Sequence, residues 1–307
     1  FSRWLPESSD ITSVSFVGDV YLGRDVDTKM RRLGYTYPFL GDPLTEGEVG
    51  VANFESAAPD QYVKTPDYTF SFAVDQRFLP LLASAKYTYL SLANNHALDK
   101  GYVGLSETVT AMRRNELVPF GTTELPSTVL ELAESSLQIG ITGFNDVTDV
   151  VSKEKIEAAI YTLSLTTDYQ IAYIHWGEEY EKVHNDRQEL LARQLIEAGY
   201  DAVIGHHPHV VQDIAMYQGA PIFYSLGNYI FDQYFSTEVR QGLRVRLTAA
   251  DNKVAYEIIP VTSEATFIQP RPMIGAVRKE FLRNLSERSQ FDIVPEVRKG
   301  HITQQIE

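Results

Sequence analysis

The chain has 307 residues, with 27 Lys and Arg against 41 Asp and Glu, and it has no cysteine. The formal charge of −14 argues against a nucleic-acid-binding protein, because binding to the phosphate backbone depends on Lys and Arg. The lack of cysteine excludes disulfides, thiolate-ligated zinc, iron–sulfur clusters and a thiol nucleophile. A hydrophobic content of 44% provides for a sizeable core and excludes a disordered chain.

Short β-rich runs alternate with amphipathic helical stretches along most of the chain. In chain order, the sequence predicts strands at residues 11–17, 49–54, 87–92, 137–144, 168–174, 201–204 and 221–226, and helices at 76–85, 103–114 and 153–161. A further helix is predicted between Asn185 or Asp186, either of which can cap it, and Gly199, which ends it. The order strand, helix, strand predicts βαβ units and a largely parallel sheet.

The last third of the chain has a different pattern. Residues 242–248 and 253–261 alternate apolar and polar side chains, which predicts an antiparallel pair that flanks or closes a second sheet. Beyond Pro272 the composition becomes more polar. There we expect a peripheral helix at residues 275–288, followed by poorly ordered last residues.

The ends of the chain also carry information. No apolar run approaches the ~18 residues that cross a bilayer. The chain begins at Phe1 rather than at methionine, which is typical of a processed or truncated start. We therefore expect any signal peptide or membrane anchor to lie upstream of this residue.

Polar residues follow five of the predicted strands, at the point where each strand ends. They are Asp19, Glu55, Asn95 with His96, His175, and His207 with His209. Ligands of α/β sheets collect at the carboxyl ends of the strands, so we expect these side chains to meet in one cleft. Carboxylate, amide and imidazole groups without thiolate suit a hard or borderline divalent cation. Two such cations about 4 Å apart can polarise a phosphoryl or carbonyl oxygen.

Each of these residues alone also has a structural interpretation. Asp19 follows a glycine and is typical of a turn, and His96 or His175 alone is typical of a hydrogen-bonded buried histidine. The run His-His-Pro-His at 206–209, directly after an apolar strand, is not typical of core packing. Six of the chain's 7 histidines lie in or near the strand ends, so the joint pattern favours a functional site.

The loop at 225–232 is expected to line the same cleft from the second sheet, through Asn228 and Asp232. A plain structural turn is the alternative for this loop.

Six motifs occur in a fixed order. They are GDVYLGR at 18–24, NFE at 53–55, ANNH at 93–96, HWGEEY at 175–180, GHHPHV at 205–210 and YSLGNYIFD at 224–232. In this order they resemble the CapA (also PgsA) family of bacterial capsule and poly-γ-glutamate biosynthesis proteins, over roughly residues 11–262. That family is similar to the calcineurin-like metallophosphoesterases.

The resemblance implies an α/β fold, a four-layer αββα sandwich of the metallophosphoesterase type. Residues 1–265 would be the CapA-like metallophosphatase-type domain and residues 266–307 a peripheral C-terminal segment. It implies a site for divalent metal (Mn, Zn, Fe or Mg) held by six residues: Asp19, Glu55, Asn95, His175, His207 and His209. It also implies that His96 and Asn95 contact the reacting group, and that Arg24 neutralises an anionic substrate.

The motifs also depart from the metallophosphoesterase pattern. Tyr21 stands where that pattern has a histidine, Glu55 replaces a bridging aspartate, and residues 94–96 read NNH instead of GNH. The extra His206 leaves the register of the histidine run open. Because Tyr21 removes one imidazole, the site would hold one metal ion, or two of unequal affinity.

The resemblance implies a capsule biosynthesis protein at the extracellular face of the cell membrane or in the cell envelope. Its partners would be an anionic polymer such as poly-γ-glutamate and the capsule synthetase membrane proteins, with no nucleic acid. Either it is a metal-dependent hydrolase or transferase acting on an ester or amide bond of an envelope polymer, or it is a non-catalytic accessory protein for polymer binding or export. A cytosolic phosphoesterase ranks last. Because a chain at −14 repels a polyanion, such a ligand needs a local positive site.

Overall fold

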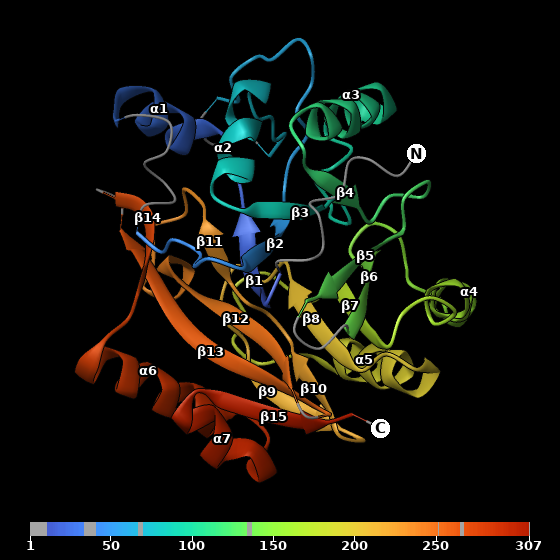
Figure 1. The fold of residues 1–307 in the computed structure, drawn as a ribbon. Coiled ribbons are helices and arrows are strands. Elements are labelled where there is room, and N and C mark those ends of the chain that lie inside the picture. The colour runs from blue at the N-terminus through green and yellow to red at the C-terminus, as the bar shows by residue number, and fades with distance from the viewer. Residues whose placement is uncertain are drawn as a thin grey trace.

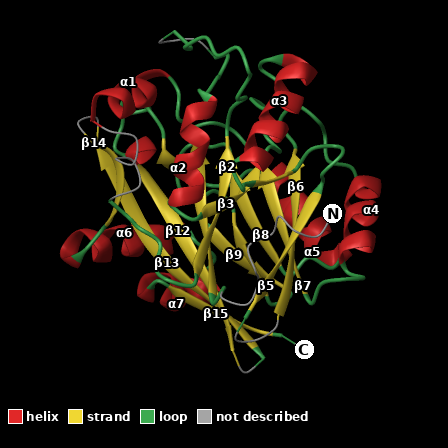
Figure 2. Ribbon diagram, turned by 45° about the horizontal axis from the view of Figure 1, so that its top comes forward, coloured by secondary structure: helices red, strands yellow, loops and turns green. Residues whose placement is uncertain are grey.

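The computed structural model describes residues 11–33, 41–66, 70–133, 137–250, 252–264 and 267–306. Within these residues the chain forms two β-sheets, one of nine strands and one of six. Figure 2 shows the two sheets lying face to face, with helices outside them.

The first sheet is mixed. Its parallel part contains the first four strands of the chain and the short β11, and its antiparallel part contains the C-terminal strands. The strand order is β14 (Phe267–Pro272), β13 (Lys253–Glu264), β12 (Gln241–Ala250), β1 (Ser13–Val20), β2 (Glu48–Phe54), β3 (Tyr87–Ser91) and β4 (Val118–Phe120), with β11 (Asn228–Ile230) beside β1 and β15 (His301–Gln305) beside β13.

The second sheet has a parallel centre with one antiparallel strand at each edge. Its order is β5 (Ser127–Leu132), β6 (Leu137–Asn145), β7 (Tyr169–His175), β8 (Ala202–His206), β10 (Ala220–Phe223) and β9 (Ile214–Tyr217). Phe16 of β1 and Tyr173 of β7 pack between the two sheets, with ring centroids 6.3 Å apart. The Tyr173 hydroxyl also donates to the carbonyl of Val17 at 3.2 Å, so this residue ties the sheets together beside the first strand end.

Helices cover both outer faces of the sandwich (Figure 1). The first sheet is covered by α1 (Arg24–Leu33), α2 (Leu79–Ser84, after the 3₁₀ turn Gln76–Phe78) and α3 (Gly101–Arg114). The second sheet is covered by α4 (Lys153–Leu163) and α5 (Asp186–Ala198). This arrangement confirms the predicted four-layer αββα sandwich. Among the described helices, none is long and apolar enough to span a membrane.

Helix α5 illustrates how local sequence sets these elements. Asn185 accepts a hydrogen bond from the backbone of Gln188 at 2.9 Å, and the Gln188 side chain accepts one from the backbone of Asn185 at 3.1 Å. This reciprocal capping box satisfies two amide groups that the helix leaves unpaired. Gly199 ends the helix with φ 116°, a left-handed conformation that costs glycine little.

The predicted antiparallel pair forms, as β12 and β13, and it extends the nine-stranded sheet rather than the six-stranded sheet that holds β7 and β8. β12 pairs with β1 in the first sheet, with Val14 opposite Leu247. The chain crosses from the second sheet to the first just before β11, where Gly18 and Gly227 approach closely. A Cβ on Gly18 would lie 1.8 Å from the carbonyl oxygen of Gly227. Position 18 must therefore be glycine for β11, and then β12, to pair with this edge of β1.

The C-terminal residues are also more ordered than the sequence predicts. β15 pairs with residues 253–257 of β13, while β14 pairs with residues 261–264 on the same edge. Because β13 is 12 residues long, β14 leaves half of that edge open for β15. α6 (Gly275–Arg288), the short turn Phe291–Ile293 and α7 (Val294–Lys299) close this end of the sandwich (Figure 1). The domain boundary at residue 265 stays a prediction.

Candidate metal centre

The carboxyl ends of two strands from each sheet meet at one point. Asp19 lies at the end of β1, Glu55 directly follows β2, and His175 and His206 are the last residues of β7 and β8. One oxygen of Asp19, one oxygen of Glu55 and one nitrogen of His175 lie within 4.8 Å of one another. All three residues are buried, and both carboxylates have 0% exposure. The parallel direction of these strands is what brings the four ends together.

Asp19 accepts a hydrogen bond from an amide and has two imidazoles within ion-pair distance. The Asn53 amide donates to its Oδ1 at 2.8 Å, while Nδ1 of His206 and Nδ1 of His209 lie 3.6 and 3.2 Å from its two oxygens. Burial alone would raise the pKa of Asp19, but the imidazoles of His206 and His209 hold that pKa well below its usual range. Asp19 is therefore a carboxylate anion, which is the form that binds a metal cation.

Glu55 is a buried carboxyl group without hydrogen bonds. Neither of its oxygens has a hydrogen-bond partner among the described residues. Nε2 of His209 and Nε2 of His96 lie 3.7 and 3.8 Å from its Oε1. Burial and the neighbouring Asp19 carboxylate raise the pKa of Glu55 well above its usual range. Two buried oxygens without partners are costly unless a further group satisfies them.

His175 and His207 form a pair beside the carboxylates. Nδ1 of His207 lies 3.1 Å from Nε2 of His175, which also lies 2.8 Å from Oδ1 of Asn95. Burial and the neighbouring His207 lower the pKa of His175 well below its usual range. Burial and the neighbouring His209 lower the pKa of His207 to about 4. Both imidazoles are therefore neutral near pH 7, which is the form that binds metal.

The histidine run has an unusual backbone. His207 has φ 99° and His209 has φ 57°, and a side chain in this left-handed region costs on the order of 1 kcal/mol or more. With this backbone, the His207 ring lies against the ring of His175, and the His209 ring lies between the carboxylates of Asp19 and Glu55. Burial lowers the pKa of His209, but Glu55 and Asp19 outweigh it and raise this pKa to about 9. Strain of this kind is concentrated at functional sites.

His96 stands at the rim of the cluster. Its Nδ1 lies 2.7 Å from Oδ2 of Asp99, and its ring stacks on Phe72 at a centroid distance of 3.8 Å. The backbone of Phe72 also donates to Oδ2 of Asp99. With Nδ1 and one ring face held, Nε2 is the nitrogen directed at Glu55. The His96 side chain is 11% exposed, so it borders both the buried cluster and solvent.

The structure thus brings together the side chains predicted for one cleft: Asp19, Glu55, Asn95, His96, His175, His207 and His209. Their roles in metal binding or catalysis stay predictions. Asn228 also lies at the cluster, with Oδ1 3.0 Å from Nδ1 of His209. It reaches the cluster on β11, which pairs with β1 in the nine-stranded sheet.

Arg24 forms an ion pair near the cluster, and its role of neutralising an anionic substrate stays a prediction. Its guanidinium forms a paired ion bridge with Asp232, with Nε 2.9 Å from Oδ2. It also lies over the rings of Phe72 and Tyr21, at 4.8 and 5.2 Å from their centroids. The charge of Arg24 is thus matched by a carboxylate close to the cluster. The Tyr21 ring stacks on Phe72 at 4.3 Å, on the other side from His96.

Sequence reasoning missed four residues of this cluster: Asn53, Asn94, Asp99 and, as a close neighbour of Asp19, His206. Asn94 donates to Oδ1 of Asn53 at 3.0 Å and to the carbonyl of Phe54 at 2.9 Å, and it accepts from the backbone of His96 at 3.1 Å. Strand periodicity could have found Asn53, because it lies two residues before Glu55 and so shares its face of the chain.

The sandwich and the cluster define a two-sheet α/β protein with a candidate divalent-metal centre at the joined strand ends. The chain belongs to the bacterial capsule synthesis protein family PGA_cap, whose family model matches residues 13–233. The predicted CapA-type membership is therefore confirmed.

Three known proteins illustrate these similarities. The chain is 29% identical over 305 residues to the PGA biosynthesis protein CapA of Bacillus subtilis, which covers 92% of this chain and 80% of that protein. It is 29% identical over 295 residues to the capsule biosynthesis protein CapA of Bacillus anthracis, and this similarity covers 87% of this chain and 71% of that protein. Its structure is similar to that of a 5′-nucleotidase from Candida albicans, with a TM-score of 0.44 and 11% sequence identity. The similarity covers 78% of this chain and 47% of the nucleotidase chain.

Proposed function

We propose that this capsule-family protein is a metal-dependent hydrolase of an anionic envelope polymer of the poly-γ-glutamate type. It would act at the extracellular face of the cell membrane or in the cell envelope, beside the capsule synthetase membrane proteins. The observation that carries this proposal is the set of buried polar atoms without hydrogen-bond partners in the described residues. They are Oδ2 of Asp19, both carboxylate oxygens of Glu55, and both ring nitrogens of His206.

These atoms fit a divalent cation. Asp19, Glu55 and His175 would hold it, because their ligand atoms already lie within 4.8 Å of one another. His206 and His209 stand next to Asp19 and supply further nitrogen donors. Protons on Glu55 and His209 would have to leave on binding, since metal competes with protons for such ligands. A donor set rich in imidazole favours Mn, Fe or Zn over Mg.

When bound, such a cation supplies a Lewis acid for the reacting ester or amide. The chain's own contribution to proton transfer is His96. Asp99 fixes the Nδ1 side of its ring, and this leaves Nε2 to donate a proton to the leaving group of the substrate. Asn95 is only partly buried and its Oδ1 binds His175, so it lies where a substrate would enter.

A second candidate function is a non-catalytic accessory protein for polymer binding or export. The full burial of Asp19 and Glu55 favours it, because a metal enclosed on every side would stabilise the fold without meeting a substrate. Both functions predict a protein that binds metal, but only the hydrolase is expected to cleave the polymer.

A cleavage assay separates the two candidates. The full chain, loaded with Mn, Fe or Zn, is incubated with poly-γ-glutamate and, separately, with a generic phosphodiester. Cleavage of the polymer by the wild type, with its loss in His96→Ala at unchanged metal content, supports the hydrolase. Polymer binding without cleavage overturns the hydrolase in favour of the accessory protein. A protein that neither binds nor cleaves the polymer contradicts both.

A further inference from the structure

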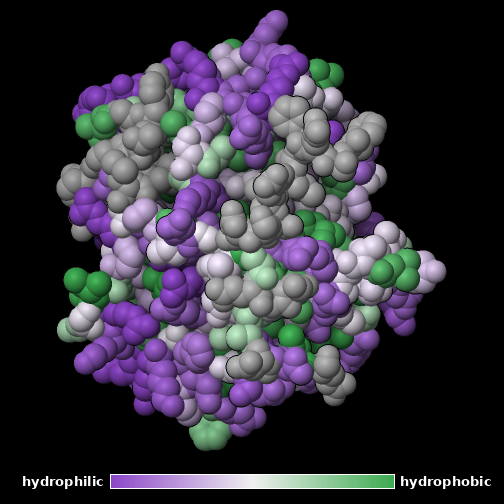
Figure 3. Space-filling model, in the orientation of Figure 1, coloured by the Kyte–Doolittle hydropathy of each residue, from purple (hydrophilic) through white to green (hydrophobic). Residues whose placement is uncertain are grey.

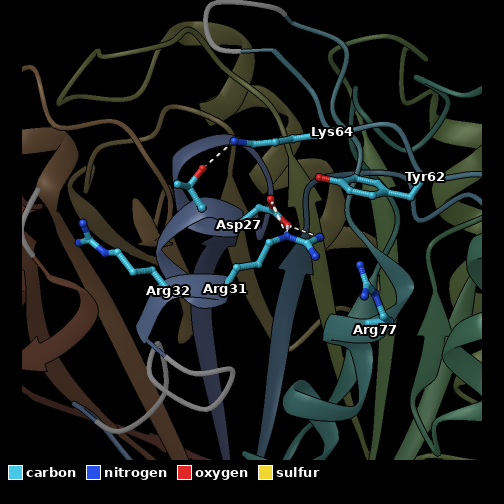
Figure 4. A pocket seen from close by; sticks show the side chains of 7 residues that line it. Asp27, Arg31, Arg32, Tyr62, Lys64 and Arg77 are labelled. Atoms are coloured by element: carbon cyan, nitrogen blue, oxygen red, sulfur yellow. Dashed lines mark hydrogen bonds and ion pairs between the residues drawn. The ribbon is translucent and has the colours of Figure 1, made fainter.

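A basic groove lies beside α1, away from the buried cluster. It is a shallow, open hollow of about 570 Å³ lined by Asp27, Thr28, Arg31, Arg32, Tyr62, Lys64 and Arg77. Figure 4 shows that Arg31 and Arg32 come from α1, while Tyr62 and Lys64 come from the segment after β2, and Arg77 from the turn before α2. Four of these seven side chains are cationic in a chain whose formal charge is −14.

The charges of this groove are layered. Asp27 and Asp75 lie beneath it and are buried, with 1% and 5% exposure. Arg31 bridges both carboxylates at 2.7 Å, and Arg77 binds Asp75 at 2.6 Å. The guanidinium side chains face outward, at 34% exposure for Arg31 and 66% for Arg77. The buried carboxylates therefore hold the two arginines in place as a cationic surface.

Two further cations are not neutralised. The Lys64 amine donates to the hydroxyl of Thr28 at 2.6 Å, and Arg32 is exposed. In the described part of the chain, neither of them has a carboxylate partner. Four cations against the two carboxylates leave the groove with a net charge of +2. A positive concavity of this kind attracts an anionic ligand even on an acidic protein.

Helix α1 connects the groove to the metal centre. It begins at Arg24, which lies over Phe72, and the Phe72 ring stacks on His96. Arg31 is seven residues further along the same helix, which is about 10 Å along its axis. An extended polymer spans this length of helix with about three residues, and a few more cover the Phe72 ring that separates Arg24 from His96. One chain could therefore reach His96 and the groove together.

We propose that this groove binds carboxylates of a linear polycarboxylate whose next segment lies at the metal centre. This inference rests on the proposed function, since it takes the polymer as the ligand of the whole protein. Arg31 and Arg77 use Nε and Nη2 to bind the buried carboxylates, so they contribute held positive charge, and the exposed charges of Lys64 and Arg32 beside them are the ones left to pair with a ligand carboxylate. The spacing of several cations along a groove suits a repeating anion better than a single small one.

The test reverses the two unpaired charges in the full chain. A short fluorescently labelled poly-γ-glutamate is titrated with wild type and with Arg32→Glu/Lys64→Glu, and binding is followed by anisotropy. We expect the double variant to bind about tenfold more weakly at low salt, because two attractions become repulsions. The difference should shrink in high salt, where such charges are screened. The buried pairs of Arg31 with Asp27 and Asp75 are left intact, so the fold is preserved.

A matched control is Lys279→Glu/Arg298→Glu, which makes the same change in net charge on exposed positions of α6 and α7. These helices lie at the other end of the molecule from α1 (Figure 1). If both double variants weaken binding equally, or if Arg32→Glu/Lys64→Glu does not weaken it, the groove is not the binding site. In either case, binding of the polymer by wild type leaves the proposed function standing. No binding by wild type contradicts the proposed function itself. Equal groove-dependent binding of polyphosphate overturns the assignment to carboxylates.

Discussion

His96 Nδ1 lies 2.7 Å from Oδ2 of Asp99, three residues later in the chain, on a turn that ends just before α3. Oδ2 of Asp99 also accepts a hydrogen bond from the backbone of Phe72, whose ring covers His96. This carboxylate therefore fixes both the ring and the segment that shields it. An imidazole with one nitrogen held in this way presents the other in a single direction.

The first prediction concerns this dyad. His96→Ala should lower the cleavage rate about a hundredfold, because it removes the proton donor for the leaving group. Asp99→Asn should lower it about tenfold and change its pH profile, since the imidazole stays but loses the charge that holds it. Both variants should keep their metal, as measured by elemental analysis. Metal loss in His96→Ala would instead make His96 a ligand.

The second prediction concerns Asn94, which connects the end of β2 to the turn that follows β3. Asn94→Ala should lower the free energy of unfolding by about 2 kcal/mol, because it leaves Asn53, Phe54 and the amide of His96 without their buried partner. Metal affinity should fall as well, since Asn53 orients Asp19. Urea unfolding and metal titration measure the two effects.

The control for Asn94 is Asn115→Ala. Asn115 makes one side-chain hydrogen bond, to the carbonyl of Ala111 at the half-buried end of α3. This variant should lose well under half of what Asn94→Ala loses and keep its metal affinity. Similar losses in both variants would show that Asn94 has no special place in the site.

Much of the cluster was accessible from the sequence because it depends on local signals. An apolar run followed by Asp19, Glu55 or His175 marks both a buried strand and its end. In a parallel sheet all such ends point the same way. The caps of α5 are local in the same sense, since Asn185, Gln188 and Gly199 act within the helix ends.

The features that were missed depend on contacts between distant segments. Nothing near Arg24 in sequence indicates that Asp232, 208 residues later, would match its charge. The place of β12 depends on how closely Gly18 and Gly227 approach, which is a property of two strands already assembled. Likewise β15 forms only because β14 leaves part of the β13 edge open.

The third prediction concerns Asp201, which directly precedes β8, at the opposite end of that strand from the metal centre. Burial raises the pKa of Asp201 to about 6, although the backbone amide of Gln170 opposes this by donating to it. The folded protein then binds this proton more tightly than the unfolded chain. Its contribution to stability is therefore fully present below about pH 4 and is lost as the pH rises through about 6.

Asp201→Asn keeps an acceptor for Gln170 and removes the buried charge. It should raise the free energy of unfolding by about 1 to 2 kcal/mol at about pH 8 and change little at about pH 4. The control is Asp168→Asn, whose carboxylate accepts from the backbone of Gln138 at an exposed position. A gain in Asp201→Asn that does not grow with pH, in urea titrations at both pH values, would refute this assignment.

Metal content of the purified full chain tests the central claim most directly. The wild type, its Asp19→Asn and Glu55→Gln variants and the control Asp168→Asn are each loaded with Mn, Fe or Zn, freed of excess ion and measured by elemental analysis. Circular dichroism confirms that each protein is folded. The buried cluster predicts at least one bound ion per chain in wild type and in Asp168→Asn, and strong loss in the two site variants. A folded wild type that retains no metal, or an Asp19→Asn variant that retains as much as wild type, would contradict a metal centre at these strand ends.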